Sequence, residues 1–373
     1  MLRYLTSGES HGTCLMGILE GMPSGVEIKE DRINADLARR QAGYGRGDRQ
    51  KIENDKVEIH SGILKGVSTG APIGLIVKNK DNTIDSMPDL VCPRPGHADL
   101  AGSLKYDTSI RAVLERASAR STAVHVAIGA ICKLLLVECR VRVASHVIQV
   151  GAASISGEMI TFEQIEKAKD TSKLNCVSSA VEEKMIALID EARENGDTLG
   201  GVIEIRVKGL PAGIGSHVQP DRKLDGQLAQ ALMSMQAIKA VGFGLGWNVG
   251  YHAGSYVHDP IAYNKEAGYH HISNNAGGIE GGMSNGEEVV VRIAKKPIST
   301  LKNPLPSVDM KTKKSTEASY ERSDTCAIAA CSVIAEAAVA FEVARALLEK
   351  TGGDSLAEIK RNLHAYKEYL KTR

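Results

Sequence analysis

The stretch PRPGHADLAGSLKYDTSIRAVLERASARSTAVHVAIGAICKLLL, residues 93–136, decides the fold. Its first part reads as a loop, because Pro93 and Pro95 exclude a helix and Gly96 allows close approach of the backbone. Its second part has small and apolar residues at helical spacing: Ala123, Val124, Ala127, Ile128, Ile131, Leu134 and Leu135. This pattern predicts a long helix with one apolar face that is suited to close packing.

The start of this predicted helix is basic. Arg111, Arg116 and Arg120 surround residues of the types that cap helix N-termini: Ser118, Ser121 and Thr122. Free backbone N–H groups and guanidinium groups would then converge on an anion. The alternative is a solvated arginine cluster on an amphipathic helix. The small residues 117–119 favour the anion site, because they leave room beside the guanidinium groups.

Composition argues against a binder of nucleic acid or membranes. The chain has 373 residues, 43% of them hydrophobic, and its 46 Lys and Arg balance 45 Asp and Glu. Seven cysteines without a CxxC pair are typical of a reduced, cytoplasmic protein. The most apolar run, residues 124–137, is too short to span a bilayer and is interrupted by His125 and Lys133. We therefore expect a cytoplasmic protein with a local anion site.

Two histidines lie in predicted turns. His11 follows GES between two predicted strands, and is either an ordinary polar turn residue or a side chain aimed into a pocket. His97 and Asp99 form a titratable pair in the loop at 93–99, from which they could reach a ligand. The other histidines show no metal-ligand spacing, so we predict no structural metal.

A glycine-rich, basic loop, GYGRGDR at residues 43–49, follows a predicted helix that starts at Asp31. It fits neither a P-loop, because no Gly-Lys-Ser/Thr follows, nor a dinucleotide fingerprint. We interpret it as a mobile lid that carries Arg40 and Arg46 to an anionic substrate. Ordinary disorder is the alternative.

The second half of the chain repeats motifs of the first half in the same order. GxPxG occurs at 21–25 and at 209–213, and each copy is followed by an Asp-Arg pair that opens a predicted helix. Residues 278–286 share five of nine residues with 62–70. Arg322 precedes an alanine-rich helix as Arg116 precedes the helix of the first half. We infer an internal duplication.

The duplication predicts an α+β fold in which each half contributes strands and one long helix of small residues. We expect a single-domain β-α-β sandwich over residues 1–373, with pseudo-repeated halves at about 1–150 and 200–350. Its long central helices would lie between antiparallel sheets. The site would then fall between the halves.

Seven motifs in this order, spread over nearly the whole chain, resemble the chorismate synthase family. They are GESHG at 8–12, RRQAGYGRGDR at 39–49, RPGHAD at 94–99, RASAR at 116–120, NNAGGIEGGMSNG at 274–286, KPIST at 296–300 and RSDTC at 322–326. The chain departs from common family patterns at Ala117 and at residues 121–122, and again at Ser323 and Thr325. Contacts made by the backbone would survive these departures.

The resemblance implies the anti-1,4-elimination of phosphate from 5-enolpyruvylshikimate 3-phosphate, which gives chorismate in the shikimate pathway. It also implies reduced FMN without net redox change, NADPH only indirectly for flavin reduction, and a homotetramer. Two other classes stay open from the residues. One is a flavin oxidoreductase with net hydride transfer, and the other is a flavin-independent enzyme or module that binds phosphate.

The resemblance also implies roles for single residues. His11 would protonate the departing phosphate, His97 would share a proton with the reduced flavin, and Asp324 would help a flavin nitrogen accept the ring proton. Substrate anions are expected at Ser10, Arg40 and Arg46. The family attaches NADP to the last two positions, but the chain has no dinucleotide fingerprint, so we favour the substrate there. The flavin is expected at Arg116, Ala117, Ser118, Gln236, Ala237, Gly281, Lys296, Pro297, Ile298, Ser299, Thr300 and Arg322.

Overall fold

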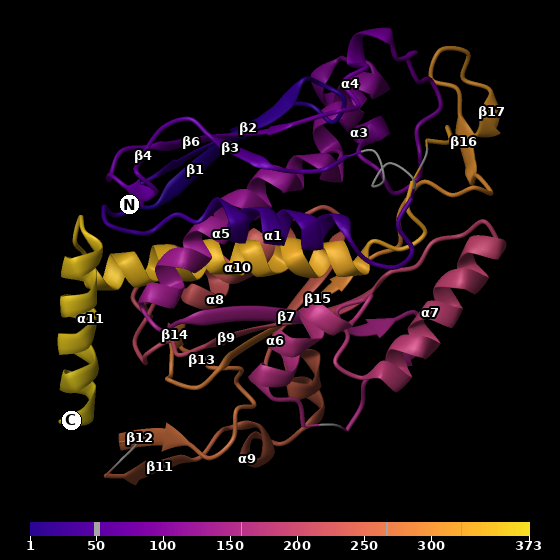
Figure 1. Cartoon of the computed structure of the whole chain (residues 1–373). Helices are drawn as coiled ribbons and strands as arrows, with labels where there is room; N and C mark the ends of the chain where they lie inside the picture. The colour runs from indigo at the N-terminus through magenta and orange to yellow at the C-terminus, as the bar shows by residue number, and fades with distance from the viewer. Residues whose placement is uncertain (48–52, 158, 266–267, 322) are drawn as a thin grey trace.

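Two long helices, α5 (Thr122–Glu138) and α10 (Ile328–Thr351), pack against each other at the centre of the molecule (Figure 1). This computed structural model describes residues 1–47, 53–157, 159–265, 268–321 and 323–373. Most residues of both helices are buried, as expected for helices that are apolar nearly all round. A Cβ on Gly129 of α5 would lie only 2.4 Å from the Cβ of Ala337 in α10. The predicted close packing of small residues is therefore confirmed.

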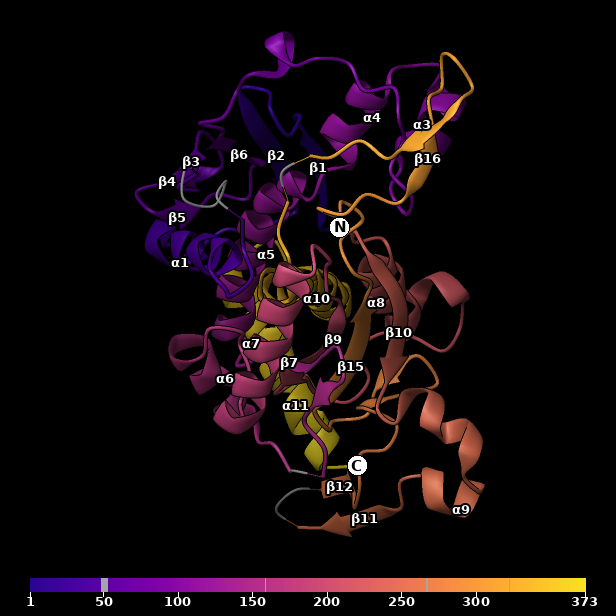
Figure 2. The ribbon, with the colours of Figure 1, turned by 90° about the vertical axis from the view of Figure 1, so that its right-hand side faces the viewer.

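An antiparallel sheet lies on each side of this helical layer, which confirms the predicted α+β sandwich (Figures 1 and 2). The first sheet has the order β1-β2-β6-β3 and the second has the order β10-β15-β9-β7-β8. The first contains β1 (Arg3–Ser7), β2 (Cys14–Glu20), β3 (Val57–Ile59) and β6 (Ile73–Lys78). The second contains β7 (Arg142–Val150), β8 (Ala153–Ser154), β9 (Gly201–Lys208), β10 (Ile238–Phe243) and β15 (Val289–Lys295).

The two sheets share a strand order and a turn geometry. Without its edge strand β8 and taken from the other edge, the second sheet has the order β7-β9-β15-β10. Strand by strand, this order corresponds to β1-β2-β6-β3 in the first sheet. In the GxPxG turns, Ser68 Oγ donates to the Pro23 carbonyl and Ser284 Oγ donates to the Pro211 carbonyl, both at 2.6 Å. Each hydroxyl also accepts a backbone N–H from its turn at 2.9 Å. We propose that these matched contacts arose by internal duplication.

Shorter elements surround this frame. Helices α1 (Glu30–Gln41) and α8 (Leu224–Met233) pack beside the central pair. The other helices within the described residues are α3 (Asp99–Tyr106), α4 (Ile110–Ala117), α6 (Phe162–Thr171), α7 (Ser179–Glu194), α9 (Gly254–Val257) and α11 (Leu356–Lys371). The 3-10 turns are η1 (Ile84–Ser86), η2 (Ala119–Ser121), η3 (Pro220–Arg222) and η4 (Gly246–Tyr251). Small antiparallel pairs are β4 (Ile63–Leu64) with β5 (Val67–Ser68), β11 (Ile261–Asn264) with β12 (Gly268–His271), β13 (Ile279–Glu280) with β14 (Met283–Ser284), and β16 (Pro306–Val308) with β17 (Ser315–Glu317).

The segment before α5 is not one continuous helix. Ser118 is extended (φ −60°, ψ 142°), so α4 ends there and η2 intervenes before α5 begins. Its hydroxyl accepts the backbone N–H of Arg120, as expected for a capping serine. By length and composition Ile110–Glu138 could cross a membrane, but 72% of its most apolar window is buried inside this fold. Its apolar residues therefore serve the core.

A buried charge cluster joins α1, α5 and α10. Glu336 accepts hydrogen bonds from both terminal nitrogens of Arg39 at 3.1 Å, from Lys133 Nζ, and from Ser145 Oγ at 2.8 Å. Asp36 pairs with the same two cations, at 2.8 Å from Arg39 and 2.7 Å from Lys133. The cluster therefore balances two cations against two carboxylates inside the helical layer.

Candidate active site

A cavity of about 690 Å³ opens where α5 and α10 begin, between the two halves of the fold. It has the size typical of a small-molecule or cofactor site. It brings together most of the predicted site residues: Ser10, His11, Arg40, Arg46, His97, Ala117, Ser118, Gln236, Ala237, Lys296, Pro297, Ile298, Ser299, Thr300 and Asp324. These residues come from segments more than 300 positions apart in the chain.

Cations outnumber carboxylates among the described residues that line the cavity. The cations are Arg40, Arg46, Arg94, Arg120, Lys295 and Lys296, and the carboxylates are Glu53, Asp81, Glu321 and Asp324. The N-termini of α5 and α10 add partial positive charge, because both helices begin at the cavity. The cavity is therefore suited to a ligand with several negative groups.

The loop between β1 and β2 positions His11 at the cavity wall. Glu115 of α4 accepts a hydrogen bond from the His11 backbone N–H at 2.8 Å, and its other oxygen lies 2.9 Å from His11 Nδ1. The backbone N–H of Ser10 donates to the Glu115 carbonyl at 2.9 Å. Ser10 Oγ also lies 3.1 Å from Ser118 Oγ. The loop is thus fixed to α4 at both residues.

His97 is supported by a buried carboxylate in the same way. Asp99, at the start of α3, is hydrogen-bonded to His97 Nδ1 and accepts from the Arg94 side chain at 2.8 and 3.0 Å. Burial alone would raise the pKa of Asp99, but the hydrogen bonds from His97 and Arg94 outweigh it and hold that pKa well below its ordinary value. Arg94 also donates to Thr300 Oγ1 at 3.0 Å, so this cluster joins the loop to the segment after β15.

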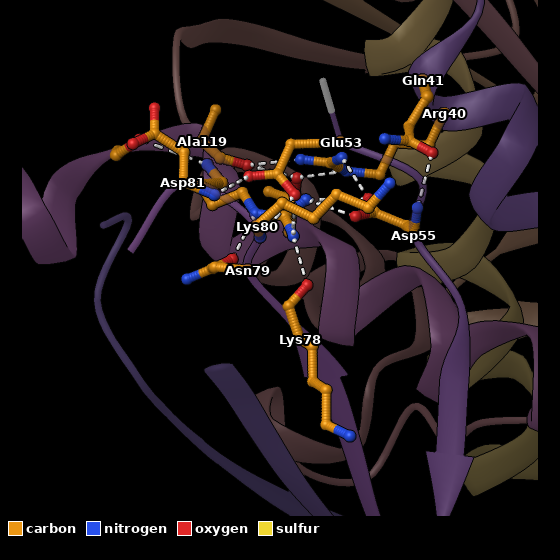
Figure 3. A network of polar contacts seen from close by, with 12 residues as sticks. Arg40, Gln41, Glu53, Asp55, Lys78, Asn79, Lys80, Asp81 and Ala119 are labelled. Carbon is orange, nitrogen blue, oxygen red and sulfur yellow. Dashed lines mark hydrogen bonds and ion pairs between the residues drawn. The ribbon is translucent and has the colours of Figure 1, made fainter. Parts of the chain in front are cut away.

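Arg40 and Arg120 share one buried carboxylate (Figure 3). Arg120 Nη1 lies 2.6 and 2.8 Å from the two oxygens of Asp55, and Arg40 Nη1 lies 3.2 Å from one of them. Arg40 also donates to Thr122 Oγ1 and to the Ala119 carbonyl, both at 3.0 Å. Both guanidinium groups are therefore held in fixed positions where α5 begins.

The prediction that a mobile lid carries Arg40 is wrong. Arg40 belongs to the last turn of α1 and is only 5% exposed. Burial is the main cause that lowers the pKa of Arg40 to about 9, with the charges of Arg120 and Arg46 acting in the same direction and Asp55 against it. The group is still protonated at neutral pH. An anion bound here would offset the repulsion among these cations.

Asp324 holds the glycine-rich loop at the cavity. Its Oδ1 accepts the backbone N–H of Gly47 at 2.6 Å, and its Oδ2 lies 3.3 Å from Arg46 Nε. The Arg46 side chain lines the cavity, as predicted, and is 10% exposed. Residues 48 and 49 of the predicted lid lie outside the described residues.

A further part of the lining comes from residues 235–237 and 295–300 and includes small and apolar side chains. Ala237 has a left-handed backbone (φ 68°), and its carbonyl accepts the Lys296 N–H at 2.9 Å. This contact joins the turn at Gln236 to the segment 296–300, and the Lys296 ammonium donates to the Gly96 carbonyl. Burial, together with Lys239 and Lys295, lowers the pKa of Lys296. Apolar side chains complete the cavity: Met87, Leu114, Met235, Ile298 and Ile334.

Three predicted flavin residues are not among the described lining residues. Arg116 is exposed on α4 and donates to the backbone carbonyls of Thr6 and Gly8 at 3.0 Å, so the three predicted basic residues do not converge. Gly281 lies in the turn between β13 and β14. Arg322 lies outside the described residues.

Sequence reasoning left several site residues unassigned. Arg94 lies in the RPGHAD motif, but the sequence predicted no binding or catalytic role for it. Arg120 was expected only as part of a cluster with Arg111 and Arg116. Arg111 instead donates to Glu321 at 2.8 Å. The carboxylates at positions 55 and 115 gave no local signal for their partners, and Asp99 was expected beside His97 but not with Arg94. Only the fold shows that each is buried against a cavity residue.

Comparison with known proteins identifies the family. The family model for chorismate synthase matches residues 2–348. Chorismate synthases of Pelobacter propionicus and Geobacter sulfurreducens are 51% and 50% identical over 392 and 391 residues, with 100% of both chains covered in each case. A solved structure titled "Crystal Structure of Chorismate Synthase" matches with a TM-score of 0.83 at 39% identity, covering 100% of this chain and 99% of that chain. The chain therefore belongs to the chorismate synthase family.

Proposed function

We propose that this chain catalyses the anti-1,4-elimination of phosphate from 5-enolpyruvylshikimate 3-phosphate, giving chorismate in the shikimate pathway. The observation that carries the proposal is the cavity itself, where two carboxylate-supported histidines face a cluster of fixed arginines. Elimination of phosphate needs groups that hold an anion and groups that move protons. This cavity contains both kinds.

The substrate anions are assigned to the arginine side of the cavity. The substrate carries a phosphate and two carboxylates, and Arg40, Arg46 and Arg120 lie where α5 and the glycine-rich loop meet. Each charge-assisted hydrogen bond contributes about 1.5 to 3 kcal/mol net. Ser10, whose hydroxyl faces Ser118, adds a neutral polar contact beside them. NADP is not assigned to these arginines.

The proton-transfer roles are assigned to the two histidines and Asp324. His11 protonates the departing phosphate, and its place in the lining of the same cavity as Arg40 and Arg46 supports this role. His97 holds a proton toward the flavin side, because Arg94 links its loop to Thr300. Asp324 would help a flavin nitrogen accept the ring proton, and its contacts with Gly47 and Arg46 keep its carboxylate at the cavity.

Reduced FMN is the proposed cofactor, and NADPH enters only as a source of electrons for its reduction. The flavin, when bound, supplies transient electron density that the elimination returns within each cycle. The chain would hold it along Ala117 and Ser118, Gln236 and Ala237, and residues 296–300. Arg116, Gly281 and Arg322 stay family-based assignments.

A homotetramer and a cytoplasmic location complete the proposal. Apolar side chains on the outer face of the first sheet support assembly, since Leu5 is 73% exposed and its cross-strand partner Ile18 is 51% exposed. All seven cysteines are free, which suits a reducing compartment. Nucleic acid and membranes are not proposed as partners.

The direct test is product formation under anaerobic conditions. With protein, reduced FMN and 5-enolpyruvylshikimate 3-phosphate, we expect chorismate and phosphate to appear together in equal amounts. Oxidised FMN should give no product. Full activity after flavin removal would make the chain a flavin-independent lyase, and net consumption of NAD(P)H with product would make it an oxidoreductase.

Replacing Arg46 by alanine should separate the substrate from the cofactor. We expect substrate binding to weaken by about ten- to a hundredfold, because one charge-assisted contact is lost. The affinity for oxidised FMN should change little. Calorimetric titration of each ligand measures both, with Arg222→Ala as the control, because the ion pair of Arg222 with Glu349 is exposed and neither residue lines the cavity. A collapse of flavin affinity with intact substrate binding would reassign the loop to the cofactor.

A further inference from the structure

The contact between Glu115 and His11 is more specific than an ordinary ion pair. The side chain of Glu115 is 2% exposed. Its Oε2 accepts the His11 backbone N–H at 2.8 Å and lies 3.1 Å from ring atom Nδ1, while its Oε1 lies 2.9 Å from Nδ1. The same residue also holds the loop through its carbonyl, which accepts the Ser10 N–H. One turn of α4 thus fixes both the position and the ring orientation of His11.

The charge state of Glu115 decides whether the hydrogen in this contact belongs to Glu115 or to His11 Nδ1. Burial alone would raise the pKa of Glu115, but hydrogen bonds from the His11 ring and amide, with the charges of His11 and Arg111, hold it below its ordinary value. Glu115 is therefore a carboxylate and can only accept. His11 Nδ1 must then carry a hydrogen in both states of the ring, which leaves Nε2 as the nitrogen that gains and loses the working proton.

The other charged groups around the pair do not replace Glu115. Arg111 Nη1 lies 3.8 Å from Glu115 Oε1, while its Nη2 donates to Glu321 at 2.8 Å. Asp81, from the loop after β6, lines the same cavity. The His11 ring atom Nδ1 lies 2.9 and 3.1 Å from the two oxygens of Glu115.

We propose that Glu115 is a positioning residue, which fixes His11 as the Nδ1–H tautomer and supports its protonated form so that Nε2 can deliver a proton in the cavity. The proposal rests on the proposed function only for what receives that proton. The tautomer and its dependence on Glu115 can be measured without any substrate.

An amide at position 115 should reverse the tautomer. The glutamine side chain has one acceptor oxygen. The His11 backbone N–H can only donate, so we expect it to donate to this oxygen. The amide N–H₂ then replaces Oε1, the oxygen nearer to Nδ1, and the ring accepts its hydrogen by moving its own hydrogen to Nε2. The shape of the contact is kept, so a purely structural role predicts no such change.

A second buried histidine–carboxylate pair gives a matched control. Glu204 of β9 is 2% exposed and lies 3.2 Å from Nε2 of the fully buried His146 of β7. Neither residue lines the 690 Å³ cavity. Glu204→Gln therefore makes the same chemical change at the same degree of burial, away from the site.

The experiment records ¹⁵N spectra of histidine-labelled protein at a pH where the rings are neutral, with His11 assigned by its loss in His11→Gln. In the wild-type chain His11 should carry its hydrogen on Nδ1, and in Glu115→Gln on Nε2. Turnover of Glu115→Gln should fall by at least about tenfold, toward the 10²- to 10⁴-fold that acid–base catalysis supplies. The alkaline limb of its pH–kcat profile should move to lower pH, because the imidazolium loses its carboxylate. Glu204→Gln should change none of these.

Two results would overturn the proposal. The first is a wild-type His11 with its hydrogen on Nε2, which does not depend on Glu115→Gln and so holds even if that variant does not fold. The second is a Glu115→Gln variant that folds and keeps both the wild-type tautomer and the wild-type pH profile. A chain with the expected tautomers but no elimination activity would instead contradict the proposed function.

Discussion

Replacing His11 or His97 by alanine is expected to lower turnover by about 10²- to 10⁴-fold, the range that general acid–base catalysis supplies. Each ring lies in the cavity and is held by a buried carboxylate, Glu115 or Asp99. Each also belongs to a loop rather than to the apolar core, so its loss removes a proton-transfer group and leaves the frame intact.

Initial rates at saturating substrate and reduced flavin measure this effect, and thermal melting checks the fold. His60→Ala is the control, because His60 is exposed and its nearest charged partner is Glu58 at 3.7 Å. Turnover within about threefold of wild type in either variant would remove that histidine from the proton-transfer role.

Replacing Glu336 by alanine is expected to lower the free energy of unfolding by about 3 to 5 kcal/mol. Glu336 is 4% exposed and balances the charges of Arg39 and Lys133. Without it Asp36 alone faces two partly buried cations. The uncompensated charge, rather than the lost attraction, accounts for most of the expected cost.

Urea titration at fixed protein concentration measures this difference, and Glu349→Ala is the control, since the exposed pair with Arg222 contributes only about 0 to 1 kcal/mol. Burial would raise the pKa of Glu336, but Arg39 and Lys133 outweigh it and hold that pKa far below its ordinary 4.5. Its contribution is therefore present above about pH 4.5 and is lost as pH falls further. An equal loss of stability in both alanine variants would contradict this role for the cluster.

Much of the frame could be predicted from the sequence, because it depends on local patterns. Small residues at helical spacing predicted the close packing that Gly129 and Ala337 make. Each GxPxG turn precedes a predicted helix, and the structure has α1 after the first turn and α8 after the second. The partners of neighbouring charged residues in a helix were harder to predict. Arg39 and Arg40 are adjacent, but successive residues point in different directions around α1, so one joins the Glu336 cluster and the other the cavity.

The partners of the site residues could not be predicted, because they depend on contacts between distant segments. Glu115 meets a residue 104 positions away, and Asp55 meets Arg120 at a separation of 65. The break between α4 and α5 also turned Arg116 outward and Arg120 inward, whereas a continuous helix would have kept both on one surface. Motifs therefore located the cavity residues, and only the fold supplied the groups that hold them.

The central claim is that the reduced flavin recovers its electrons in each cycle, so that product forms without consumption of reductant. The ratio of product to reductant tests this claim most directly. Under strict anaerobiosis, dithionite is added in slight excess over FMN to protein and 5-enolpyruvylshikimate 3-phosphate, and chorismate and phosphate are counted. Substrate and product have the same summed oxidation state, so we predict equal amounts of both products, far exceeding the reductant added. Product that stops at one equivalent per electron pair would contradict the account.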